Sequence, residues 1–192
     1  MHIVQIDTQV ASSRRPRALP VKSIRVALVS MPFFSAKAPS IQLGLLKAIA
    51  NNAGFLTTTF HLNVDFSARI GSSLYESICD HRGHLGEWIF STAAFGHKTG
   101  VDRMMVLDIF SKDESVLRMA RSSTGIGTDS ALAELLDRLQ GQLAPEFLED
   151  AIRSIRWEHF DVVGFTSTFQ QNPDSIYRVM KHLFTASTIL AL

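Results

Sequence analysis

The sequence predicts an α/β fold: a Rossmann-like parallel sheet in the flavodoxin-like order 2-1-3, incomplete, with a long helical insertion between the second and third strands. Residues 24–29 and 161–165 are short apolar runs with β-branched residues, which is typical of strands covered on both faces. Residues 56–62 alternate apolar and polar in their second half, which indicates a strand nearer the sheet edge. A helical pattern joins the first two strands, as a parallel crossover requires.

The segment before the first strand is polar, basic and interrupted by Pro16. We expect residues 1–22 to form a disordered leader ahead of a domain over 23–192. An arm that contacts a peptide or a nucleic acid is the alternative.

A loop from Ser30 to Ser40 leads from the first strand into a helix predicted over 41–54. Ser40 can cap the start of this helix, and Gly54 can supply the left-handed residue at its end. The loop contains neither G-x-G-x-x-G nor G-x-x-x-x-G-K-[ST], so neither a dinucleotide nor a P-loop nucleotide site is expected. No acidic pair follows the strand, which argues against a phospho-receiver domain that holds magnesium.

Residues 63–160 form a connection far longer than one crossover helix requires, and we expect this insertion to be helical. Asp129 or Ser130 is expected to cap its fourth helix, and Pro145 to precede its fifth. Apolar residues recur at helical spacing in five groups: Ile70, Leu74, Ile78; Leu85, Trp88, Ile89, Phe95; Met104, Met105, Ile109, Phe110; Leu132, Leu135, Leu136, Leu139, Leu143; and Phe147, Leu148, Ala151, Ile152, Ile155.

Hydroxyl and amide side chains follow the third strand directly, over residues 166–171. Asn172, Pro173 and Asp174 then provide the N-cap, the first position and a favourable first-turn charge of a further helix. In the order 2-1-3 the switch point falls between the loops 30–32 and 166–168, and open α/β sheets bind ligands at such a point. We therefore expect a ligand crevice between these two loops.

Composition excludes several classes of function. The 192 residues are 46% hydrophobic and 19% charged with a net charge of +1, which fits one soluble domain and gives no argument for nucleic acid or an acidic membrane surface. Cys79 is the only cysteine, so this chain alone builds no disulfide framework, Cys-rich zinc site or iron–sulfur cluster. No signal-peptide h-region and no apolar run of membrane length occurs, so a cytoplasmic location is the default.

Several stretches, in the same order along the chain, resemble the N-terminal region of one enzyme family. They lie within residues 24–183 and comprise 26–33 (VALVSMPF), 39–48 (PSIQLGLLKA), 85–90 (LGEWIF), 95–96 (FG) and 161–172 (DVVGFTSTFQQN). As a set they resemble the RiPP-maturation radical S-adenosylmethionine C-methyltransferases, cobalamin-dependent radical SAM enzymes that act on ribosomally made peptides.

The resemblance implies a Rossmann-like cobalamin-binding domain that precedes a radical SAM barrel, and the implied cofactor site coincides with the predicted crevice. A corrin requires a broad platform of loop backbone and small polar side chains. Ser40 and Asn172 can instead serve only as helix caps. Leu43 can instead belong to the core, and Gly44 can permit close packing. The candidate cobalamin contacts are Ser30, Pro32, Ser40, Leu43, Gly44, Ser167, Thr168, Gln170 and Asn172.

Two departures from the family's pattern bear on activity. The catalytic half of these enzymes holds a [4Fe–4S] cluster with C-x-x-x-C-x-x-C, and Cys79 alone cannot replace that motif. The chain also ends at Leu192, in what reads as the beginning of a fourth strand. We therefore expect a truncated or split N-terminal fragment that is not catalytic alone, with the [4Fe–4S] cluster and S-adenosylmethionine belonging to the missing part.

The histidines give no cobalt ligand, because the D-x-H-x-x-G spacing of histidine-ligated cobalamin domains is absent. His81, His84 and His97 can be drawn as a metal site, but no carboxylate pair or cysteine completes it, and we interpret them as solvated loop residues.

An alternative function is a non-catalytic α/β module that binds a precursor peptide or a partner barrel subunit. A stripe of apolar residues in the insertion can serve such an interface, although a helix core is the more ordinary role. The stripe is Met104, Met105, Ile109 and Phe110.

Overall fold

The computed structural model describes residues 24–80, 85–96 and 128–166, together with positions 108, 111, 112, 114, 117, 118 and 181. The sheet consists of β1 (Arg25–Ser30), β2 (Leu56–His61) and β3 (Val162–Thr166), which are parallel and lie in the order β2-β1-β3. The predicted fold class is confirmed, with β1 central and a long helical region between β2 and β3.

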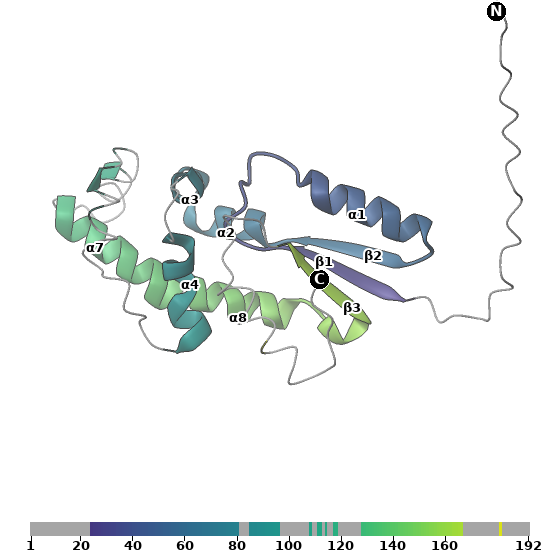
Figure 1. Cartoon of the computed structure of the whole chain (residues 1–192). Coiled ribbons are helices and arrows are strands. Elements are labelled where there is room, and N and C mark those ends of the chain that lie inside the picture. Colours follow the sequence, from purple (N-terminus) through teal and green to yellow (C-terminus); the bar gives the residue numbers. More distant parts are fainter. Residues whose placement is uncertain are drawn as a thin grey trace, which may run out of the picture.

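One side of the sheet is covered by α1 (Ile41–Asn52), which connects β1 to β2 (Figure 1). The Ser40 side chain accepts a hydrogen bond from the Leu43 N–H at 3.2 Å, so Ser40 is the N-cap. Gly54 follows the helix with a φ of +91°, which is the left-handed region that favours glycine. Both predicted helix signals are therefore confirmed.

The other side of the sheet faces the helical region, and α8 (Ala144–Ser154) runs along it in Figure 1. Ala27 and Val29 of β1 and Val163 of β3 belong to the same buried cluster as the apolar residues of these helices. Alternate strand residues point to opposite faces, so Leu28 points to the side of α1. The sheet is thus covered unevenly, with the main core on the helical side.

Between β2 and α8 the chain forms α2 (Leu62–Ile70), α3 (Ser72–Asp80) and α4 (Leu85–Phe95). The bounds of α4 agree with the apolar spacing in the sequence. The grouping of Ile70 with Leu74 and Ile78 in one helix is wrong, because Gly71 separates α2 from α3. Gly71 has a φ of +91°, a conformation that no residue inside an α-helix adopts.

The helices α7 (Thr128–Arg138) and α8 belong to one continuous helix, joined by the π turn η1 (Leu139–Leu143) (Figure 1). The predicted caps Asp129 and Ser130 are wrong, because α7 already includes Thr128. Pro145 lies at the first turn of α8 and does not begin a separate helix. A proline has no N–H for the regular i→i−4 series, and the wider π turn comes directly before this interruption.

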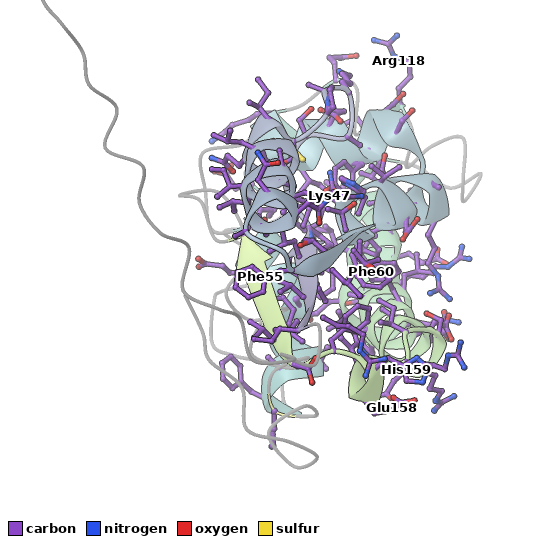
Figure 2. The ribbon with its side chains drawn as sticks, turned by 90° about the vertical axis from the view of Figure 1, so that its right-hand side faces the viewer. Lys47, Phe55, Phe60, Arg118, Glu158 and His159 are labelled. Atoms are coloured by element: carbon purple, nitrogen blue, oxygen red, sulfur yellow. The ribbon has the colours of Figure 1, made fainter. Side chains whose placement is uncertain are left out.

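The short 3-10 helix η2 (Trp157–His159) leads from α8 into β3. It closes the core below the sheet, because Phe60 of β2 has its ring 6.0 Å from that of Trp157 and 5.6 Å from that of Phe160. Figure 2 shows Phe60 on this helical side, near His159, and Phe55 on the opposite side of the sheet.

Several predicted features lie outside the described residues. They are the leader 1–22, His81, His84 and His97, the stripe Met104, Met105, Ile109 and Phe110, and nearly all of the helix predicted from Asn172 onward. Within the described ranges, no helix combines the length and the apolar character that a bilayer span requires.

Candidate ligand site at the carboxyl edge of the sheet

The carboxyl ends of β1 and β3 place two hydroxyl side chains next to each other. Ser30 at the end of β1 is paired in register with Thr166 at the end of β3, and on its other side with His61 of β2. Neighbouring strands lie about 4.8 Å apart, so these side chains share one face and one edge of the sheet. Ser30 is fully buried, whereas His61 is exposed.

Three buried oxygen atoms at this edge have no hydrogen-bond partner among the described residues. They are the Oγ of Ser30, the Oγ1 of Thr166 and the Oδ1 of Asn63, which follows β2 by two residues. A buried polar atom without a partner costs about 1–3 kcal/mol, and most such atoms in native proteins are paired. Ser30 and Thr166 end β1 and β3, and Asn63 lies in the first turn of α2 just after β2, so these three buried oxygens lie at the carboxyl edge of the sheet.

The loop between β1 and α1 is fixed from one side by a buried carboxylate. Glu76 of α3 is 5% exposed, and its two oxygens accept hydrogen bonds from the Ser35 hydroxyl at 2.9 Å and from the Ala36 N–H at 2.8 Å. A buried donor that loses its acceptor costs about 1–3 kcal/mol, so both hydrogen bonds favour the observed position of the loop. Glu76 therefore holds the loop at a set distance from the helical region.

Two further side chains hold the same loop at the carbonyl of Phe34. The Tyr75 hydroxyl donates to this oxygen at 2.8 Å, and the Asn63 amide donates to it at 3.4 Å and to the Ser35 carbonyl at 3.4 Å. Burial raises the pKa of Tyr75 far above its usual value, and the nearby Cys79 and Glu76 raise it further. Tyr75 thus remains a neutral donor to the loop over the whole physiological pH range.

Phe33 anchors the loop in the aromatic core of the helical region. Its ring lies 5.1 Å from Tyr75, 5.7 Å from Phe66 and 5.9 Å from Phe90, measured between ring centroids. A Cβ added to Gly86 would lie only 2.5 Å from a carbon of the Phe33 ring, so Gly86 leaves the space that this ring fills. The apolar anchor and the polar contacts together preorganise the loop above the strand ends.

The described candidate contacts differ in their exposure to solvent. Ser30, Pro32, Ser40 and Leu43 are buried, and Gly44 is exposed. Ser40 is a true cap, and its carbonyl also accepts the Gly44 N–H at 3.1 Å. Gly44 does not permit close packing within the described part of the chain, because a Cβ at this position would meet no atom within 4 Å.

The remaining candidates, Ser167, Thr168, Gln170 and Asn172, lie outside the described residues. The described residues therefore include the end of β1 and the end of β3, on the two sides of the predicted crevice. They do not include residues 167–172. In the described part of the chain, no group of three or more His, Cys, Asp or Glu side chains is arranged to hold a metal ion.

Sequence reasoning missed the residues that hold the loop, namely Asn63, Tyr75 and Glu76. One signal was available for Glu76. Glu76 lies at helical spacing next to the buried Tyr75 and Cys79, and a carboxylate on a buried apolar stripe must find partners or be neutral. Asn63 gives no comparable signal, because it follows a strand end where polar residues are ordinary.

Comparison of the chain with protein-family models, with curated proteins and with solved structures found no match.

Proposed function

We propose that this chain is a cobalamin-binding domain of a radical S-adenosylmethionine methyltransferase that C-methylates ribosomally made peptides, and that it is not catalytic by itself. The proposal combines the sequence resemblance with one observation, namely three buried oxygens at or next to the carboxyl ends of the strands that have no partner among the described residues. The periphery of a corrin carries many amide groups, which both donate and accept hydrogen bonds. Hydroxyl groups such as those of Ser30 and Thr166 suit either partner.

The shape of the edge also supports a broad, flat ligand. Figure 1 shows α1 beginning near the carboxyl ends of the strands, with the loop of residues 31–40 arching between them. Gly44 in the first turn of α1 has no side chain, and a Cβ added at this position would meet no atom within 4 Å. Glu76 and Tyr75 fix the loop, which lowers the ordering cost of binding.

Bound cobalamin would supply methyl-group transfer, and the residues of this chain would bind and orient it. The hydroxyls of Ser30 and Thr166 would pair with peripheral amides, and Ser40 would keep α1 in place beside the ring. His61 is exposed at the adjacent strand end, and in this proposal it does not coordinate cobalt.

The first test is reconstitution of the full chain with hydroxocobalamin, followed by desalting and an ultraviolet–visible spectrum. Retained corrin absorbance supports the proposal. Its absence, in a folded protein, favours the alternative of a non-catalytic α/β module that binds a precursor peptide or a partner subunit. His61→Ala should leave both binding and the spectrum unchanged, and a spectral change would show that His61 coordinates cobalt.

A matched pair of substitutions locates the ligand. Thr166→Val and Thr57→Val each remove a buried hydroxyl that has no partner among the described residues, one at the carboxyl end and one near the amino end of the sheet. Neither substitution should lower the free energy of unfolding, because each removes a buried hydroxyl whose lack of a partner destabilises the folded state. Only Thr166→Val should weaken cobalamin binding, by roughly 2- to 10-fold for one hydrogen bond. Equal cobalamin affinities of the two variants would contradict a binding site at the carboxyl edge of the sheet.

A further inference from the structure

The outward face of α1 is apolar, the reverse of the usual pattern for a helix on a sheet. Its large apolar residues have high exposed fractions: Ile41 83%, Leu45 58%, Ile49 57% and Leu46 48%. Only Leu43 in this helix is buried. At 100° per residue, Ile41, Leu45 and Ile49 form a stripe on the side of α1 opposite to Leu43. A contiguous exposed apolar surface on a folded protein usually marks an interaction site.

This face carries no charge. Lys47 is the only charged residue in α1, and it lies one turn after the buried Leu43, on the side toward the sheet. A partner with a charged surface would therefore lose hydration and find no opposite charge here. Two identical copies of the face, by contrast, meet without like-charge repulsion.

The order of residues along the stripe is self-complementary. Ile41, Leu45 and Ile49 read the same from either end, so two antiparallel copies pair Ile41 with Ile49 and Leu45 with Leu45. A two-fold interface requires this kind of self-matching surface. Gly44 and Ala48 lie beside the stripe and are exposed, and Gly44 has open space where a side chain would project. Small residues at these positions leave hollows for the Ile and Leu side chains of the partner helix.

We propose that the outward face of α1 is a self-association surface, on which α1 of a second copy packs antiparallel about a two-fold axis beside Leu45. The interface consists of three turns of helix on each side. Contacts smaller than about 1,200 Å² in total are typical of weak complexes. The dimer is therefore weak, and its population rises with protein concentration. This inference does not rest on cobalamin binding.

The test is the mass of the full chain in solution, measured by sedimentation equilibrium over a wide range of concentration. The wild-type mass should rise from that of a monomer toward that of a dimer, and Leu45→Glu should remain a monomer throughout. Val64→Glu is the matched control, because Val64 is 45% exposed on α2, outside the face. It should associate as the wild type does. A wild-type monomer at every concentration, or a dimer that Leu45→Glu leaves intact, would overturn the proposal.

Disulfide trapping tests the antiparallel geometry. Cys79 is buried, so an introduced cysteine is the accessible thiol. Leu45→Cys places two thiols next to the two-fold axis, where the Cα atoms can approach within the roughly 7 Å that a disulfide needs. Under mild oxidation Leu45→Cys should yield a covalent dimer and Val64→Cys should not. A Leu45→Cys protein that does not crosslink at concentrations where the wild type is dimeric would rule out this pairing.

Discussion

Replacing Gly86 with alanine tests whether the loop above the strand ends depends on the aromatic core. The new Cβ would lie 2.5 Å from one carbon and 3.1 Å from a second carbon of the Phe33 ring. The ring cannot easily shift, because Phe33 is 3% exposed and packed against Phe66, Tyr75 and Phe90. Overpacking of this kind costs about 1–3 kcal/mol. The substitution also gains up to about 1 kcal/mol of helix propensity, so the expected net loss is about 1–2 kcal/mol.

Urea unfolding followed by circular dichroism measures this loss. With an m-value of about 2 kcal/mol/M, the midpoint should fall by about 0.5–1 M. Gly44→Ala is the matched control, because Gly44 also lies in a helix but has no atom within 4 Å of an added Cβ. It should raise the midpoint through helix propensity alone, when measured at low protein concentration. A Gly86→Ala protein as stable as the wild type would refute the packing argument.

A double substitution separates the clash from other effects of Gly86→Ala. Phe33→Leu makes the side chain smaller at the point of contact and destabilises the protein by itself, because it empties part of a buried site. If the clash is the cause, the double variant should be more stable than the sum of the two single losses predicts, by about 1 kcal/mol or more. Strict additivity would place the effect of Gly86→Ala elsewhere.

Two further predictions concern the polar contacts of the loop. Glu76→Ala leaves the Ala36 N–H and the Ser35 hydroxyl without their acceptor, so it should lower the free energy of unfolding by about 3 kcal/mol. Glu76→Gln keeps one acceptor oxygen and should lower it by less than half of this amount. Urea unfolding measures both losses. The raised pKa of Tyr75 means that the folded state retains a proton that the unfolded state loses above pH of about 10, so stability should fall as the pH rises beyond this value. Tyr75→Phe, compared with the wild type in alkaline unfolding, should show a weaker fall, and identical slopes would contradict this assignment.

The sheet and the first helix could be predicted from sequence because their signals are local. Apolar runs identified β1 and β3, and Ser40 and Gly54 marked the ends of α1 by the hydrogen bond and the positive φ that they supply. The order β2-β1-β3 is the flavodoxin-like order that we expected for this fold class, in which the first strand lies between the second and the third.

The helical region was harder to predict because its boundaries depend on tertiary contacts. Pro145 is an ordinary sign of a helix start, yet here the helix continues through a π turn that buries Gln140. The Gln140 amide donates to the Trp88 carbonyl at 2.9 Å and to the Ser91 hydroxyl at 3.2 Å, which ties η1 to α4. No spacing in the sequence reveals a contact between residues about fifty positions apart.

The first two helices of the insertion, α2 and α3, do more than connect β2 to β3. A single crossover helix would cover the sheet, but it would not reach past the strand ends to the loop between β1 and α1. The insertion places α2 and α3 there, where Asn63, Tyr75 and Glu76 bind the backbone of that loop. Phe33 from the same loop completes the core of the insertion, so each part stabilises the other. A loop held in this way keeps the hydroxyl of Ser30 and the start of α1 in a fixed relation, which a ligand-binding edge requires and an ordinary surface loop does not.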